Sequence, residues 1–211
     1  MQEILDQIKQ AIISRDIKAM AGLVDQALEQ GVAPEVLVND GLVAAMDVVG
    51  EQFGNKEIFV PEMLVSAKLM SNSLAKVKPL MVSGADSGRG TVMMCTVKGD
   101  LHDIGKNLVT MMMEGAGFKV YDLGVDVTAD QVAAKVAELK PQVLGLSALL
   151  TTTMPEMEKV INILTEMGIR NDVKVMVGGA PVSQDFANKI GADGYGEDAG
   201  KAVALARAFV G

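Results

Sequence analysis

The stretch at residues 99–107, Gly-Asp-Leu-His-Asp-Ile-Gly-Lys-Asn, has the residue types and spacing that could do chemistry. It holds His102, the only histidine in the chain, between the carboxylates of Asp100 and Asp103. A neutral imidazole is a common ligand of transition metals, and a carboxylate on its second ring nitrogen orients it. The stretch therefore suggests a metal ligand at His102, whereas composition alone favours an ordinary solvated histidine.

A phosphate-binding loop is a third interpretation of the same stretch. Gly99, Gly105 and Lys106 suggest it, but five residues separate the two glycines where a phosphate loop has four. Asn107 also stands where that loop needs a hydroxyl group for magnesium. The spacing therefore argues against a phosphate loop.

The elements around residues 99–107 place the stretch at the edge of a parallel sheet. Residues 91–97 form a short apolar run bounded by glycine, as expected of a buried parallel strand, and residues 108–114 are expected to be helical. Residues 99–107 are then a loop at the carboxyl end of a strand, where open α/β sheets place ligand chemistry.

Strand and helix patterns alternate along the whole second half of the chain. This alternation predicts an α/β, Rossmann-like (flavodoxin-like), doubly wound parallel sheet of five strands. The expected strands are residues 92–97, 119–123, 143–147, 173–177 and 193–195, and the expected helices are residues 108–114, 129–139, 154–167, 183–189 and 199–209.

The first part of the chain shows only helical periodicity and predicts an all-α four-helix bundle. Asp16 is expected to cap a second helix that ends at Gly31, and Pro34 to open a third that ends near Gly54. The fourth helix follows Pro61. Because residues 83–90 are rich in glycine and small polar residues, we predict a linker there and two domains, residues 1–86 and 87–211.

Composition excludes several partners and compartments. A net charge of −8 and a pI near 4.7 argue against nucleic acid or an anionic membrane as partner. One cysteine cannot form an internal disulfide framework, and the charged amino terminus differs from a signal peptide. No apolar run approaches the length of a membrane span, so we expect a cytoplasmic protein.

The sequence Asp100-x-His102-x-x-Gly105 resembles the Asp-x-His-x-x-Gly signature of cobalamin-binding domains, and its continuation through Lys106 and Asn107 is similar to the methyl-transferring, methionine synthase-like group. The resemblance implies that His102 ligates cobalt from below in a cobalamin or related corrinoid bound base-off and His-on, in its methylcobalamin form during turnover. It also implies that Asp100 accepts a hydrogen bond from His102. Thr153 would continue this relay, where the family usually has serine.

The resemblance assigns further residues to the cofactor. Small or polar residues after the later strands would line a slot for the displaced nucleotide tail, although each one singly fits a plain βα turn. Residues 48–63 resemble the helical cap that shields the upper cobalt face, with bundle core as the alternative, above all for Met63. The implied cofactor-binding set is Asp100, His102, Asp103, Ile104, Gly105, Ser147, Leu149, Thr151, Thr153, Gly178, Gly179, Ala180, Tyr195, Gly196, Phe53, Val60 and Met63.

By this resemblance the chain is a corrinoid protein of a methyltransferase system in one-carbon metabolism, with little activity alone. It would carry a methyl group from a substrate-specific methyltransferase to a second methyltransferase that acts on tetrahydrofolate or a thiol, and a reductive activase would maintain it. The methyl donor stays open among methanol, a methylamine, a betaine and an aryl ether.

Three alternatives remain. A cobalamin-binding sensor would need an output element, yet the chain has no basic DNA-binding helix. The cobalamin domain of a radical mutase would lack the cap sequence, and a nucleotide-binding flavodoxin-like domain is the most distant alternative.

Overall fold

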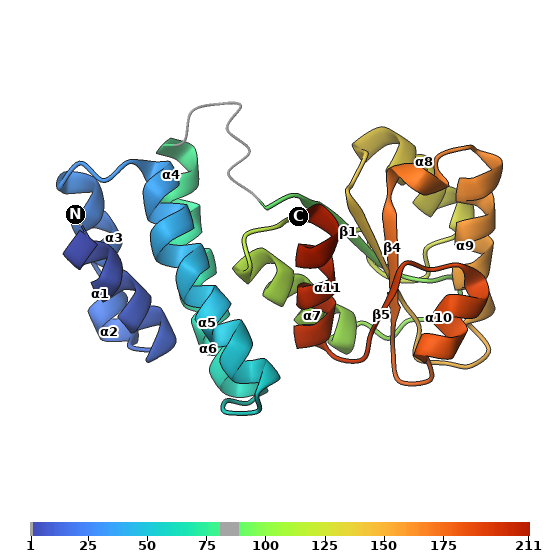
Figure 1. The fold of residues 1–211 in the computed structure, drawn as a ribbon, viewed down its shortest axis with the longest axis horizontal. Helices are drawn as coiled ribbons and strands as arrows, with labels where there is room; N and C mark the ends of the chain where they lie inside the picture. The colour runs from blue at the N-terminus through green and yellow to red at the C-terminus, as the bar shows by residue number, and fades with distance from the viewer. Residues whose placement is uncertain (1, 81–88) are drawn as a thin grey trace. The chain divides into compact units, whose positions relative to one another are not determined.

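A computed structural model describes residues 2–80 and 89–211, which divide into a helical unit and an α/β unit (Figure 1). Residues 83–88 of the predicted linker, and the predicted boundary after residue 86, lie outside the described residues. The exact domain boundary therefore stays a prediction.

The longer helices of the helical unit each bury one largely apolar face. In α1, the buried residues are Ile4, Leu5, Ile8, Ala11 and Ile12, which recur with the spacing of one helix face. Its elements are α1 (Gln2–Ile13), α2 (Ile17–Met20), α3 (Leu23–Glu29), α4 (Pro34–Val36), a π-helical segment (Leu37–Val43), α5 (Ala44–Gly54), α6 (Val60–Val77) and a 3-10 turn (Lys78–Leu80).

The predicted second helix was wrong in one respect, because the chain forms two short helices there. Asp16 does cap α2, since its Oδ1 accepts the Ala19 amide at 2.9 Å. Ala21 is then extended, and Gly22 adopts φ +95°, which ends the helix before α3 starts. The other helices begin and end close to the expected residues.

The α/β unit is a five-stranded, fully parallel sheet in the order β2-β1-β3-β4-β5, as predicted. Helices α7 and α11 cover one face of the sheet, and α8, α9 and α10 cover the other (Figure 1). The strands are β1 (Thr91–Thr96), β2 (Lys119–Asp122), β3 (Val143–Ser147), β4 (Lys174–Gly178) and β5 (Gly194–Gly196). The helices are α7 (Ile104–Gly115), α8 (Ala129–Leu139), α9 (Pro155–Glu166), α10 (Gln184–Ile190) and α11 (Ala199–Val210), with a 3-10 turn at Arg170–Asp172.

The central strands are buried on both faces, which explains their continuous apolar runs. Alternate residues such as Met93, Leu144 and Val175 pack into one cluster with the apolar sides of α8, α9 and α10. Cys95 belongs to this cluster, and burial raises the pKa of its thiol to about 12, so it is unreactive at neutral pH.

Helix α7 begins earlier than the sequence indicated, and this corrects the extent of the loop at residues 99–107. The first helical bond runs from the Asn107 amide to the Asp103 carbonyl at 2.7 Å, and the Asn107 side chain also donates to the Asp103 carboxylate at 3.0 Å. Ile104 and Gly105 therefore lie in the first turn of the helix. The glycine there made the sequence look like loop.

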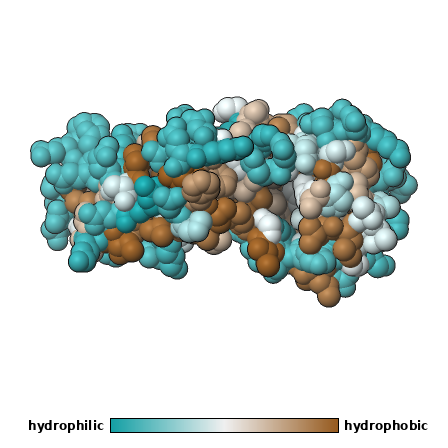
Figure 2. All heavy atoms as spheres, turned by 90° about the horizontal axis from the view of Figure 1, so that it is seen from below, coloured by the Kyte–Doolittle hydropathy of each residue, from teal (hydrophilic) through white to brown (hydrophobic). Residues whose placement is uncertain are grey.

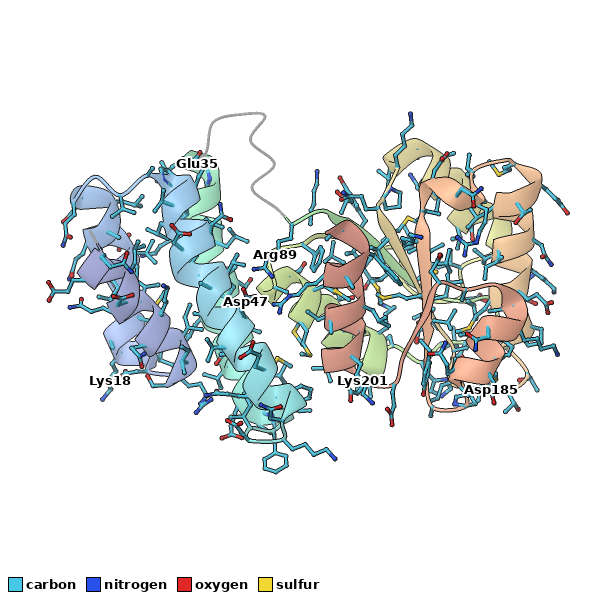
Figure 3. The ribbon with its side chains drawn as sticks, viewed as in Figure 1. Lys18, Glu35, Asp47, Arg89, Asp185 and Lys201 are labelled. Atoms are coloured by element: carbon cyan, nitrogen blue, oxygen red, sulfur yellow. The ribbon has the colours of Figure 1, made fainter. Side chains whose placement is uncertain are left out.

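Most charged side chains lie on the outside of the two units, with the buried Asp100 and Lys106 as exceptions. Lys18 on α2, Asp185 on α10 and Lys201 on α11 are exposed examples (Figure 3). Within residues 2–80 and 89–211, no helix has the length and apolar content that crossing a membrane would require.

Candidate functional site

The site lies where β1 and β3 end side by side. Thr96 pairs with Ser147 at the last position of these two strands. The chain then leaves β1 toward α7 and β3 toward α9, which cover opposite faces of the sheet (Figure 1). Open α/β sheets bind ligands at this switch point, and the loops that meet there carry Asp100, His102 and Thr153.

Asp100 is the centre of the site. Its side chain is completely buried, and Oδ1 lies 2.7 Å from His102 Nδ1 and 3.1 Å from the His102 amide nitrogen. Its other oxygen, Oδ2, accepts hydrogen bonds from the backbone amides of Leu149 at 2.7 Å and Leu150 at 3.2 Å, and from the Thr153 hydroxyl at 2.8 Å. One carboxylate thus joins both loops.

These hydrogen bonds decide the charge of Asp100. Burial by itself raises the pKa of the carboxyl, but the donors from Leu149, His102 and Thr153 outweigh it and hold the pKa of Asp100 well below its usual range. An ionised carboxylate can only accept hydrogen bonds, so Nδ1 of a neutral His102 must carry the proton. The Nε2 lone pair is then available for a ligand.

The His102 side chain is 51% exposed, so a ligand can reach the imidazole from outside. In the part of the chain that the structure describes, no cluster of three or more His, Cys, Asp or Glu residues could hold a metal by itself. A metal at His102 would have to bring its other ligands with it. A macrocyclic metal complex fits this donor set.

Exposed apolar side chains come from both loops around His102. Leu101 is 70% and Ile104 is 87% exposed, and they flank the imidazole in sequence. Leu149 and Leu150, whose amides bind Asp100, are 43% and 41% exposed. Figure 2 looks onto this edge of the α/β unit, where brown apolar atoms lie among teal ones. An apolar surface around a free imidazole suits a large, flat ligand.

The remaining predicted residues of this unit follow the carboxyl ends of the strands. Gly178 ends β4 opposite Ser147 and Gly196, while Thr151 and Ala180 are exposed in the adjoining loops. Gly179 adopts φ +127°, and a Cβ there would lie 1.9 Å from the Ala148 carbonyl oxygen. The backbone itself therefore requires glycine at this position. Tyr195 is half-buried in β5.

The comparison with known proteins decides the family. Residues 90–204 match the B12 binding domain family, and residues 4–78 match a second family with the same description. The chain belongs to the B12-binding corrinoid proteins. It is 44% identical over 209 residues to the trimethylamine corrinoid protein of Methanosarcina barkeri, covering 98% of this chain and 96% of that protein.

Solved structures agree with this assignment. The chain superimposes on one chain of the methanol:cobalamin methyltransferase complex of Methanosarcina barkeri with a TM-score of 0.88 and 36% identity, and the match covers 100% of this chain and 80% of that chain. A cobalamin-binding protein from Desulfitobacterium hafniense gives a TM-score of 0.81 and 33% identity, covering 98% of both chains.

The three predicted cap residues of this corrinoid protein lie in the helical unit. Phe53 is half-buried near the end of α5, and Val60 is 36% exposed at the start of α6. Met63 is fully buried, which is also what a bundle-core residue would show. The place of these residues over the cobalt stays a prediction.

Sequence reasoning missed several contacts that shape the site. The buried Thr96 donates its hydroxyl to the His102 carbonyl at 3.0 Å, and the buried Lys106 forms an ion pair with Asp122. Asp126 accepts the Gly99 amide at 2.7 Å. Residue types alone do not predict these contacts, because the partners come from neighbouring strands and loops.

Proposed function

We propose that this corrinoid protein binds its cofactor base-off, with Nε2 of His102 as the lower ligand of cobalt, and carries a methyl group between two methyltransferases. The observation that carries the proposal is the ionised, buried Asp100, which holds the Nδ1 proton and leaves Nε2 free at the ligand-binding edge of the sheet. When bound, the corrinoid supplies a cobalt that accepts and releases methyl groups.

The residues around Asp100 control the proton on His102. If Nε2 bound a metal, the carboxylate would accept a hydrogen bond from Nδ1–H and make the imidazole a better electron-pair donor to that metal. A His102 released from a metal would have Nε2 free to take up a proton, and the charge of Asp100 would stabilise the resulting imidazolium. Thr153 donates to the far oxygen of Asp100 and keeps that oxygen turned away from the ring.

The glycine-rich ends of the later strands are proposed to accommodate the nucleotide tail of the cofactor. The residues involved are Ser147, Thr151, Gly178, Gly179, Ala180, Tyr195 and Gly196, all at the carboxyl ends of strands β3 to β5 or in the loops that follow them. Phe53, Val60 and Met63 are proposed to shield the upper face of the corrin.

The partners proposed are a substrate-specific methyltransferase, a second methyltransferase acting on tetrahydrofolate or a thiol, and a reductive activase, all in the cytoplasm. Relatives named trimethylamine and dimethylamine corrinoid proteins support methylamines as the first donors to test. The solved complex of a similar chain in a methanol:cobalamin methyltransferase supports methanol as the next.

The test loads the protein with hydroxocobalamin, reduces it, and mixes it with methyltransferases purified from the same cells and one isotopically labelled methyl donor at a time. Transfer of label to about one equivalent of protein-bound corrinoid, only with a matching methyltransferase, supports the carrier function. Tight corrinoid binding without methylation by any donor would favour the sensor alternative.

A further inference from the structure

The loop that follows β2 lies directly against the loop that carries His102. The Thr96 amide donates to the Gly124 carbonyl at 2.9 Å, and the Val127 amide donates to the Thr96 carbonyl at 3.1 Å. Val97 and Val127 then pair as an isolated parallel bridge. The backbone of residues 124–127 therefore continues the sheet beside the start of the His102 loop.

Asp126 makes two contacts with that loop, on consecutive residues. Its Oδ1 accepts the Gly99 amide at 2.7 Å, and its own amide donates to the Asp100 carbonyl at 3.1 Å. Asp126 has a φ of +56°, a left-handed conformation that aspartate and asparagine adopt more readily than most residues. This conformation lets side chain and amide reach the same turn.

The turn held by Asp126 leads straight to the Asp100 carboxylate. The Asp100 amide donates to the Val97 carbonyl at 3.2 Å, and Gly99 has a φ of +79°, as the third residue of a type II turn does. In such a turn the Gly99 amide takes no part in the closing bond, and Asp126 is its partner. Without that partner, the Lys98–Gly99 peptide at the centre of the turn would lose the hydrogen bond that holds its amide.

We propose that Asp126 is a positioning residue for His102. By holding the Gly99 amide and the Asp100 carbonyl, it fixes the direction in which the Asp100 carboxylate leaves the backbone and so selects the Nδ1–H form of the imidazole. The selection of this form is a property of the polypeptide alone. Its effect on cobalt rests on the proposed function.

The first test uses the cofactor-free, full-length protein. Because the chain has one histidine, a long-range ¹H–¹⁵N spectrum at alkaline pH shows a single neutral imidazole, whose two nitrogen shifts report which one carries the proton. Asp126→Gly keeps the left-handed backbone accessible and removes the acceptor, whereas Asp126→Asn keeps both. Lys140→Gly is the matched control, because exposed Lys140 also has a positive φ, +47°, but lies before β3.

We expect the parent, Asp126→Asn and Lys140→Gly to show the Nδ1–H form, and Asp126→Gly to shift toward the Nε2–H form. A parent-like spectrum for Asp126→Gly would overturn the proposal. The proposal would also be overturned if Asp126→Asn shifted toward the Nε2–H form as far as Asp126→Gly, because the charge of Asp126 and not its hydrogen bonds would then select the imidazole form. If Asp126→Gly does not fold, slow hydrogen exchange of the Gly99 amide in the parent supports the hydrogen bond to Asp126 on which the proposal depends, and fast exchange overturns the proposal.

The second readout is the share of cobalt(II) cobalamin with a protein nitrogen ligand, measured by electron paramagnetic resonance. Because residues that act behind a metal ligand typically change metal affinity 10- to 100-fold, we expect the ratio of His-on to His-off to fall about tenfold in Asp126→Gly. A shifted imidazole form with no ligation in any variant would contradict the proposed function and leave the positioning role of Asp126 intact. Unchanged ligation together with a parent-like imidazole would contradict the positioning role alone.

Discussion

At the scale of single residues, the site depends on one carboxylate whose two oxygens bind different loops. Asp100 binds the His102 ring through Oδ1 and the second loop through Oδ2. The resemblance of the motif around His102 to cobalamin-binding domains predicted this pair, and Thr153 was predicted as the residue that matches the family's hydroxyl position. The backbone amides of Leu149 and Leu150 could not be predicted as donors, because every residue except proline has a backbone N–H and the residue type does not show which one is used.

Replacing Asp100 tests the proton relay. Asp100→Asn keeps size and an acceptor but removes the charge that favours an imidazolium, so release of His102 from cobalt(II) should require a pH lower by about one unit. Thr153→Val should lower it less, and Thr153→Ser, which keeps the hydroxyl, should match the parent. A pH titration of the cobalt(II) spectrum measures all four proteins. An Asp100→Asn midpoint equal to that of the parent would exclude the relay.

Two glycines of the site should respond differently to alanine. A Cβ on Gly105 meets no atom within 4 Å, and the residue lies in the first turn of α7, so Gly105→Ala should keep or slightly raise the stability of the cofactor-free protein. It should weaken cobalamin binding about tenfold, because the added methyl group takes space that we assign to the corrin.

Gly179→Ala is the contrasting change. Its Cβ would collide with the Ala148 carbonyl in a backbone region that alanine disfavours, so the α/β unit should lose about 3 kcal/mol of unfolding free energy. Thermal unfolding without cofactor and equilibrium titration with hydroxocobalamin separate the two effects. Equal stability losses in both variants would contradict this account.

At the scale of elements, the helices and strands that show a hydrophobic periodicity could be predicted from the sequence. Helix ends that depend on a single hydrogen bond or backbone angle could not. The central strands were predicted because buried parallel strands are continuous apolar runs, and the predicted bounds of β3 are the observed ones. The start of α7 was missed because Asp103 and Asn107 stabilise a first turn that contains glycine. The break between α2 and α3 was missed because it depends on the φ of Gly22. The role of the loop after β2 came only from the structure.

Asp193 accepts hydrogen bonds from Arg170 and from the Val175 amide of β4, and these contacts predict how the stability of the α/β unit depends on pH. Burial raises the pKa of this carboxyl, but the Val175 amide at 2.8 Å and Arg170 at 2.7 Å lower it overall. A lowered pKa in the folded state means that Asp193 stabilises the fold above the ordinary carboxyl pKa of about 3.9 and loses this effect as pH falls through the folded value.

Asp193→Asn should therefore cost about 1–2 kcal/mol at pH 7 and much less at pH about 3. Both tyrosines of the chain, Tyr121 and Tyr195, lie in the α/β unit, and there is no tryptophan, so tyrosine fluorescence during urea unfolding reports on this unit alone. A cost that does not change with pH would mean that the Asp193 charge contributes nothing.

At the scale of the whole molecule, each of the two units matches a B12 binding domain family. If the helical unit covers the upper face of the cofactor, removing Phe53 should let light break the cobalt–methyl bond faster, because the radical pair escapes more easily. We expect faster photolysis of the methylated protein in Phe53→Ala at unchanged cofactor content. Phe59→Ala is the matched control, since Phe59 is 68% exposed and is not among the three residues predicted to shield the methyl group. Equal rates for both variants and the parent would place Phe53 in the bundle core.

The central claim is that Nε2 of His102 binds cobalt, and one measurement tests it directly. Because His102 is the only histidine, growth on ¹⁵N-histidine labels a single imidazole in the whole protein. The cobalt(II) protein reconstituted with unlabelled cobalamin is then examined by electron paramagnetic resonance. We predict that the axial nitrogen splitting changes from triplets in the unlabelled protein to doublets in the labelled protein. Triplets that persist in the labelled protein would show that the cofactor's own base, or another nitrogen, occupies the position that we assign to His102.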